Sequence, residues 1–168
     1  MENHAEIEQE FINHFQEVLQ EPLIDRRHAI EKITQHVPKV ITEEHNQLLL
    51  RPIEPKEVDL AMKQLKEGKA PGLDGFSTTF FHSFWELIKG EVWQVVEESR
   101  SLHWMLPSLN STFISLIPKE DSTITSDKFR PISLCNFIYK VISKVIANRL
   151  KSLLPLLISP EQSGYIEG

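Results

Sequence analysis

The sequence predicts an α+β protein that is mostly helical and contains one β-hairpin. Apolar residues recur at helical spacing over most of the 168 residues. Two short β-branched and aromatic runs lie on either side of a polar loop between residues 112 and 135, as in a hairpin. A long amphipathic pattern follows directly after the second run. Hydrophobic content of 40% and charged content of 25% are ordinary for a globular domain of this length.

Helices are predicted throughout the N-terminal part of the chain. Apolar residues over 7–19 follow a helical period, and residues 25–36 are ambiguous but fit a short helix. A third helix begins at the cap residue Thr42, where two carboxylates follow and favour the helix dipole. A fourth begins at Pro55 and ends at Gly68. These helices carry no catalytic pattern.

A turn is predicted over residues 69–75, which read Lys-Ala-Pro-Gly-Leu-Asp-Gly. Proline fixes one backbone dihedral, and the two glycines allow positive φ. A phosphate-binding P-loop is excluded, because the segment lacks the long glycine spacing and the Lys-Ser/Thr ending of that motif.

A further helix is predicted after the turn, resuming beyond Gly90 and continuing toward Leu102. It carries an aromatic stripe that could stack nucleic-acid bases, but at this spacing such a stripe is far more often part of a core. The stripe consists of Phe80, Phe81, Phe84, Trp85 and Ile88.

The hairpin strands are predicted over Thr112–Ile117 and from Phe129, with a polar loop over 120–128 between them. Asn136 is the predicted N-cap of an amphipathic helix over 137–154. Pro155 would end that helix. Ser159, Pro160 and Gln162 then form a second capping signal.

Charge is distributed unevenly along the chain. The net charge is −6, which argues against a general nucleic-acid binder. Residues 1–67 hold 8 Lys/Arg against 14 Asp/Glu, whereas residues 109–151 hold 7 Lys/Arg against 3 Asp/Glu. On charge alone, these seven cations would be interpreted as a solvated face.

Cysteine and hydropathy limit the environment of the chain. Cys135 is the only cysteine, so no intrachain disulfide can form and a reducing compartment fits. A lone cysteine is most often a small buried hydrophobe. No apolar run reaches the length of a membrane span, and the N-terminus does not resemble a signal peptide.

Three segments carry a resemblance to a known family. The stretch FRPISLCNFIYKVISKVIANRL at 129–150 resembles the second fingers motif of reverse transcriptases from non-LTR (LINE-type) retrotransposons, in the form common in plant genomes. KAPGLDGF at 69–76 and FISLIPK at 113–119 agree with the same family in the same order. The likeness covers about residues 41–168, and less distinctly extends back to Phe11. Leu73 stands where the family usually has proline, which should loosen the turn.

The resemblance implies a fold, a division of the chain and a set of site residues. The chain would be the front end of a right-hand polymerase fold, with an acidic helical linker at 1–67 and a partial reverse transcriptase domain at 68–168, truncated before the palm. In the family, residues matching Lys119 and Arg130 contact the triphosphate of the incoming nucleotide. Template contacts are expected from Lys140, Lys144, Gln162 and Gly164. The family's structural turn motif is matched by Pro71, Gly72, Asp74, Gly75 and Phe76.

The resemblance also implies chemistry that this chain lacks. In the complete enzyme, palm aspartates hold two Mg²⁺ ions that join nucleotides. The five aspartates here, at 25, 59, 74, 121 and 127, match none of those motifs. No catalytic residue, metal ligand or cofactor is therefore expected in the chain alone, which should not polymerise. The complete enzyme would bind an RNA template, a DNA primer and dNTP, in the cytoplasm and nucleus.

Two other interpretations remain open from the sequence. The acidic N-terminal helices fit a helical protein-interaction module, and the chain could be a non-functional genomic remnant. Salt-sensitive binding of oligonucleotides or dNTP would favour the polymerase fragment. Salt-insensitive binding of a protein partner would favour the interaction module.

Overall fold

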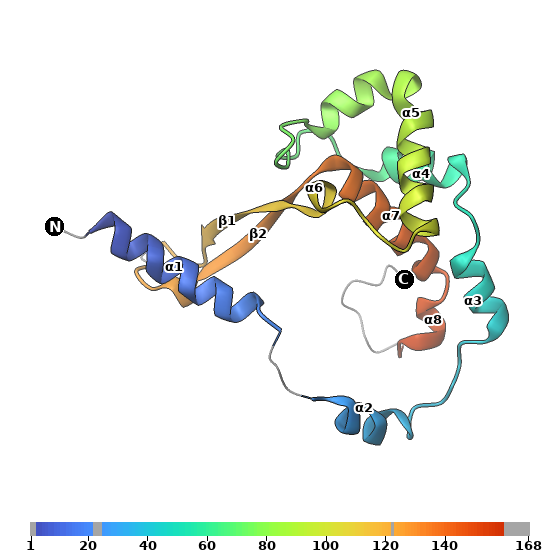
Figure 1. Cartoon of the computed structure of the whole chain (residues 1–168), viewed down its shortest axis with the longest axis horizontal. Helices are drawn as coiled ribbons and strands as arrows, with labels where there is room; N and C mark the ends of the chain where they lie inside the picture. Colours follow the sequence, from blue (N-terminus) through green and yellow to red (C-terminus); the bar gives the residue numbers. More distant parts are fainter. Residues whose placement is uncertain (1–2, 22–24, 122, 160–168) are drawn as a thin grey trace. The chain divides into compact units, whose positions relative to one another are not determined.

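The computed structural model describes residues 3–21, 25–121 and 123–159 (Figure 1). Within them the chain is mostly helical with one two-stranded antiparallel sheet, which confirms the predicted fold class. The chain divides into two compact units, each described here by itself. The first consists of Met1–Pro38 and Ile114–Ser133, and the second of Lys39–Phe113 and Leu134–Gly168.

The first unit packs a helix against the outer part of the hairpin. It contains α1 (His4–Leu19), α2 (Arg27–Thr34), the 3₁₀ turn η1 (Ser126–Lys128), and most of strands β1 (Thr112–Pro118) and β2 (Phe129–Cys135). The ring of Phe11 meets that of Phe129 edge-on, with centroids 4.9 Å apart. Phe15, one turn later, is buried. The amphipathic face predicted for α1 therefore contacts the hairpin.

The register of the hairpin is marked at both ends. The amide of Lys119 donates to the carbonyl of Lys128 at 2.9 Å, and the hydroxyl of Thr112 lies 3.6 Å from the sulfur of Cys135. Both pairs fit one continuous antiparallel ladder. Because side chains alternate between faces, Phe129 lies on the face that α1 contacts, and Arg130 lies on the opposite face.

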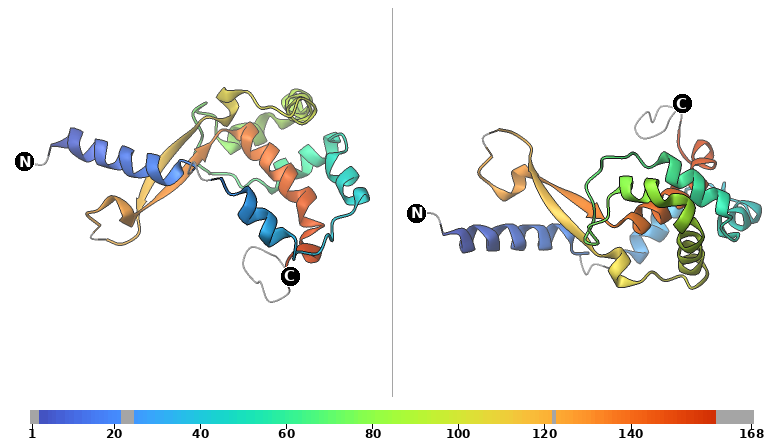
Figure 2. Two further views of the ribbon diagram at one scale, coloured as in Figure 1. Left: turned by 60° about the horizontal axis from the view of Figure 1, so that its bottom comes forward. Right: turned by 90° about the horizontal axis from the view of Figure 1, so that it is seen from above.

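The second unit is built around three mutually packed helices, α4 (Pro55–Gln64), α5 (Thr78–Ser101) and α7 (Phe137–Lys151) (Figures 1 and 2). It also contains α3 (Glu43–Leu50), α6 (Pro107–Asn110) and α8 (Leu154–Leu157). The rings of Phe81 and Phe137 stack with centroids 3.6 Å apart. The buried core also includes Val58, Ala61, Met62, Val92, Val96, Val141 and Val145.

Several boundaries differ from the predicted ones. Helix α5 is continuous through Gly90, because burial of Val92 and Val96 on the core face outweighs a glycine cost of about 1 kcal/mol. Helix α7 ends at Lys151 instead of Leu154, and Pro155 lies in the first turn of α8. The short elements α6, η1 and α8 were not predicted, since each has too few residues for a periodic pattern.

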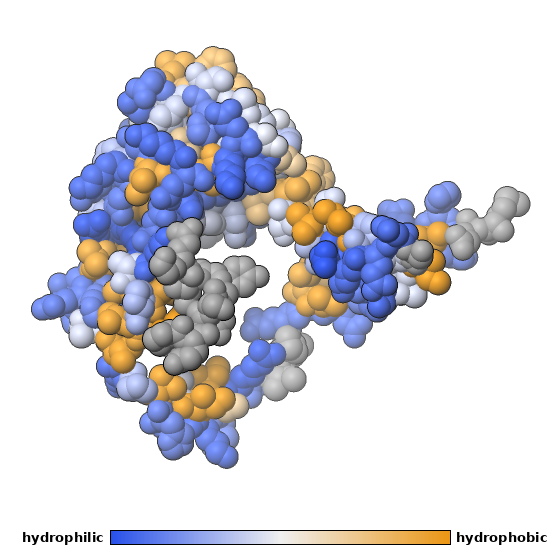
Figure 3. All heavy atoms as spheres, turned by 180° about the vertical axis from the view of Figure 1, so that it is seen from behind, coloured by the Kyte–Doolittle hydropathy of each residue, from blue (hydrophilic) through white to orange (hydrophobic). Residues whose placement is uncertain are grey.

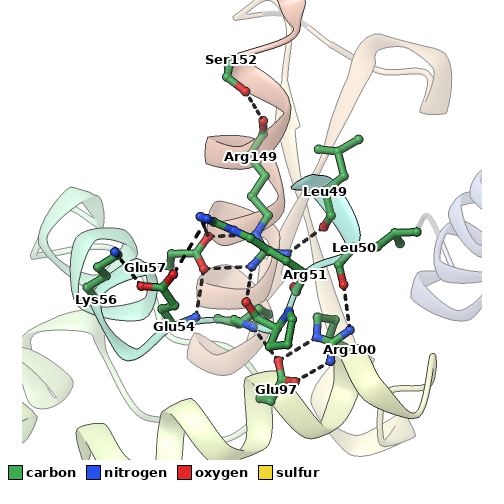
Figure 4. Close-up of polar contacts among 12 residues, drawn as sticks. Leu49, Leu50, Arg51, Glu54, Lys56, Glu57, Glu97, Arg100, Arg149 and Ser152 are labelled. Atoms are coloured by element: carbon green, nitrogen blue, oxygen red, sulfur yellow. Dashed lines mark hydrogen bonds and ion pairs between the residues drawn. The ribbon is translucent and has the colours of Figure 1, made fainter. Parts of the chain in front are cut away.

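The guanidinium of Arg149, on α7, binds the connection that joins α3 to α4 (Figure 4). Arg149 donates to both carboxylate oxygens of Glu57, at 2.8 and 2.9 Å, and its side chain is only 9% exposed. It also donates to three backbone carbonyls, at 2.7–3.0 Å, those of Leu49, Arg51 and Pro52. A second arginine, Arg100 on α5, donates to the carbonyl of Leu50 at 3.0 Å. The polar backbone of this connection is thus satisfied by side chains.

Part of the apolar surface of the second unit has no cover within the described residues. A groove of about 390 Å³ lies between α3, α5 and α7, lined mainly by apolar side chains that include Leu49, Ile53, Met105, Ile142 and Ile146. Ile146 is 53% exposed. Figure 3 shows apolar residues, in orange, among the hydrophilic surface. None of the described helices is long and apolar enough to cross a membrane.

We predict an acid-sensitive contribution from Glu57. Its bond with Arg149 lowers the pKa of Glu57 from 4.5 to about 2. A carboxylate whose pKa is lower in the folded state stabilises the fold above pH 4.5, and this stabilisation is lost as the pH falls toward 2. The pKa shift corresponds to about 3 kcal/mol. In urea denaturation at several pH values, Glu57→Gln should be less stable than wild type near neutrality, and the difference should shrink as the pH falls.

The control for this prediction is Glu86→Gln, because the side chain of Glu86 is 84% exposed. This variant should keep the pH dependence of the wild type. Equal pH dependence of the free energy of unfolding in Glu57→Gln and wild type would contradict the prediction.

We also predict that the uncovered groove makes the chain associate. Exposed apolar patches of a few hundred Å² bind hydrophobic dyes and promote association. The purified chain should enhance the fluorescence of such a dye, and Ile146→Lys should reduce that signal and the apparent size in light scattering. Leu87→Lys is the control, since Leu87 is 77% exposed on α5 and does not line the groove. A monodisperse monomer that binds no dye would show that the prediction is wrong.

Candidate functional site

Three cations lie near the loop end of the hairpin, Lys119, Lys128 and Arg130. The register pairs Lys119 with Lys128 directly, and pairs Ile117 with Arg130 two rungs further along the ladder. Opposed residues in an antiparallel ladder point to the same side, and so do residues two apart on one strand. The register therefore puts Lys119 and Arg130 on one face, while Lys128, in η1, is beside Lys119 through the bond between their backbones. Their proximity creates a local positive field that suits an anionic ligand.

Each of the three cations has a different environment. The ammonium of Lys119 donates to the carbonyl of Asp127 at 2.7 Å, and Lys128 lies 3.6 Å from the carboxylate of Glu120. A hydrogen bond from Thr125 keeps the pKa of Asp127 below its ordinary value, so this carboxylate stays ionised near the cations. Arg130 is exposed. Within the described part of the chain, its guanidinium makes no hydrogen bond or ion pair with another residue. Of the three cations, Arg130 is thus the most available to a ligand.

Sequence reasoning missed Lys128. The segment before Phe129 is predicted as a polar loop, and a loop residue has no assigned partner across the hairpin. The structure places Lys128 in η1, where its carbonyl accepts the Lys119 amide. Counting back along both strands from a paired Thr112 and Cys135 would have given this pairing.

The candidate template residues in α7 belong to the second unit. Lys140 is on the first turn of α7, and its ammonium donates to the carbonyl of Ala70 at 3.0 Å. Lys144 follows one helical turn later, on the same side of the helix. Gln162 and Gly164 lie outside the described residues. Lys119 and Arg130, in contrast, belong to the first unit.

The predicted turn over 69–75 is formed. The amide of Gly75 donates to the carbonyl of Gly72 at 3.2 Å, which closes a four-residue turn despite Leu73. A carboxylate oxygen of Asp74 accepts from the amide of Phe76 at 3.0 Å. Gly75 has φ of +74°, a conformation that glycine adopts without strain. Pro71 precedes the turn and is exposed.

Asn136 connects this turn to α6 and α7. Its side-chain oxygen accepts from the amide of Asp74 at 3.2 Å, and its amide nitrogen donates to the carbonyl of Ser108 at 2.8 Å. The residue is only 4% exposed. Asn136 is the N-cap residue of α7, as predicted, but its side chain makes no capping hydrogen bond. The side-chain oxygen, which a capping bond would use, accepts the amide of Asp74 instead.

Gly72 lies against Asn136 with no room for a side chain. A Cβ built on Gly72 would be 2.3 Å from the side-chain oxygen of Asn136, 2.4 Å from its backbone nitrogen and 2.6 Å from the carbonyl carbon of Cys135. Two of these atoms belong to the backbone and cannot rotate away. The glycine is therefore required by close approach of the turn to the start of α7.

The described residues contain no cluster of side chains that could act as metal ligands. Among the described residues, no three His, Cys, Asp or Glu side chains come together so as to hold a metal ion. Cys135 is half-buried and its sulfur contacts the Thr112 hydroxyl. The chemistry that the candidate residues offer is the binding and positioning of an anion.

The chain is similar in sequence to a transposon protein. It is 32% identical over 140 residues to the "Transposon TX1 uncharacterized 149 kDa protein" of Xenopus laevis, which covers 83% of this chain and 11% of that protein. This similarity supports a non-LTR retrotransposon origin for the chain. The chain thus spans about a tenth of that relative. No family model matches the sequence.

We predict that Gly72→Ala destabilises the second unit. The new methyl group would push the turn away from Asn136 and break the bond to Asp74. Overpacking of this kind typically costs about 1–3 kcal/mol. Gly90→Ala is the matched control, because a Cβ at Gly90 meets no atom within 4 Å and should stabilise α5 by up to about 1 kcal/mol. Both changes are measured by chemical denaturation. Wild-type stability in Gly72→Ala would contradict the close approach.

Proposed function

We propose that the chain is a fingers fragment of an RNA-directed DNA polymerase from a LINE-type retrotransposon, in the form common in plant genomes. In this role it contributes contacts to the incoming nucleotide and the template. The similarity to a transposon protein supports the origin. The three motif segments support the polymerase assignment. A domain division at residues 67 and 68 and a location in cytoplasm and nucleus are parts of the same proposal.

The observation that carries the proposal is the shared face of Lys119 and Arg130. The polar loop separates these two residues in the sequence, and the hairpin register brings them two rungs apart on the same face of the ladder. A triphosphate presents several closely spaced oxygens, so it is bound best by converging cations. Arg130 can donate two parallel hydrogen bonds to phosphate oxygens, whereas Lys119 acts as a point charge.

Within this proposal the chain binds and positions substrate, and the chemical step belongs to the complete enzyme. Magnesium ions held by palm aspartates would supply the activation of the attacking and leaving oxygens. The described residues offer no such acidic set. RNA template, DNA primer and dNTP are accordingly the partners that we propose for the complete protein.

A second candidate function is a helical protein-interaction module. The apolar groove between α3, α5 and α7 is the observation that favours it. Binding through this groove would bury apolar surface and depend little on salt. Binding of an oligonucleotide or dNTP through the hairpin cations would weaken steeply as salt rises.

We predict that Arg130→Ala reduces nucleotide use in a longer polypeptide that includes the palm. Hydrogen bonds to charged groups contribute about 1.5–3 kcal/mol. At about 1.4 kcal/mol per tenfold, the loss is about ten- to a hundredfold in kcat/KM for dNTP, measured by primer extension. Arg130→Lys should recover part of the activity, because an ammonium keeps the charge and loses the fork. Lys119→Ala should act in the same direction, less steeply.

The control is Arg26→Ala, which removes the same charge from an exposed position before α2. It should leave the nucleotide KM unchanged. If Arg130→Ala abolished template binding and left nucleotide kinetics intact, the triphosphate role would be wrong.

A further inference from the structure

A buried asparagine holds an exposed turn at a fixed place on α7. Asn136 is 4% exposed and bonds to Asp74 in the turn and to Ser108 in α6. Buried amides with both polar groups satisfied are rigid parts of a structure. Gly72, on the same turn, fits against Asn136 only because it lacks a side chain. Two independent features therefore specify the same approach of turn and helix.

The same approach brings cations together. Lys140, one turn into α7, reaches the turn itself, where its ammonium donates to the carbonyl of Ala70. Lys69 is the residue directly before Ala70, and it is exposed. Within the described residues, neither lysine forms an ion pair with a carboxylate. The carboxylate of Asp74, on this turn, accepts the amide of Phe76. Lys140 thus contacts the residue that directly follows Lys69.

We propose that Asn136 is a positioning residue that holds the 69–75 turn on α7, so that Lys69 and Lys140 form one contact surface for the phosphates of single-stranded RNA. The proposal rests on the template contact proposed above for Lys140, and adds Lys69 and the means of alignment. Lys144, one turn further along α7, extends the surface in the direction of the helix. Phosphate contacts of this kind fix the register of a strand without reading its sequence.

The test measures binding of a short fluorescent single-stranded RNA to the whole chain by anisotropy, over a range of salt concentrations. Each phosphate neutralised on a single strand adds about 0.7 to the slope of log affinity against log salt. Lys69→Gln and Lys140→Gln should each reduce that slope by about 0.7. Lys89→Gln, on the exposed surface of α5, is the charge-matched control and should keep the wild-type slope.

Asn136→Ala and Gly72→Ala remove no charge, yet both should reduce affinity and slope. Each variant is first compared with wild type by circular dichroism, and Gly72→Ala serves if Asn136→Ala does not fold. In a background that already carries Lys69→Gln and Lys140→Gln, either change should have little further effect on binding. Such non-additivity separates positioning of the lysines from a general loss of stability.

Two results would overturn the inference, and they differ in what else they affect. If the lysine variants lower the slope while folded Asn136→Ala and Gly72→Ala bind as wild type, positioning by Asn136 is wrong and the template contact stands. If neither lysine variant changes the slope, or wild type binds RNA without salt dependence, the proposed template contact of Lys140 is itself wrong.

Discussion

The guanidinium of Arg149 holds the second unit together at the place where secondary structure is missing. Residues 51–54, between α3 and α4, form no helix or strand, and the last carbonyls of α3 lack partners within that helix. Arg149 donates to the carbonyls of Leu49, Arg51 and Pro52 and to the carboxylate of Glu57 at the same time. One buried charge therefore holds α4, α7 and the connection between α3 and α4. Loss of one partner from a buried pair typically costs about 3–5 kcal/mol. The ion pair with Glu57 joins α4 to the C-terminal end of α7.

The sequence predicted the helices and the hairpin well, because both depend on local periodicity and on turn residues. It did not predict the partners of Arg149, since these are backbone carbonyls about a hundred positions away, and any residue supplies a carbonyl. Asn136 was predicted correctly as the N-cap residue of α7, but the hydrogen bonds of its side chain were not predicted. Asparagine favours N-caps in general, and here a buried site offers it Asp74 and Ser108 instead. Lys119 and Arg130 were predicted from the resemblance of their motifs to the family. Lys128 could be identified only from the pairing of residues across the hairpin.

Both units carry surface features that suit contacts with other molecules. Cations gather near the loop end of the hairpin in the first unit, and around the 69–75 turn in the second. The groove between α3, α5 and α7 leaves apolar side chains in solvent. No acidic cluster among the described residues would hold a metal beside either set of cations.

The hairpin register has a consequence for how such sequences can diverge. Insertion or deletion of one residue within β2 would move Arg130 to the face that α1 covers, and would turn Phe129 out to solvent. The same change in the loop between Lys119 and Lys128 would leave both strands in phase. Variation in length among copies of such an element should therefore be tolerated in the loop and selected against in the strands. Copies that have lost selection should carry frame-preserving gaps in both places equally.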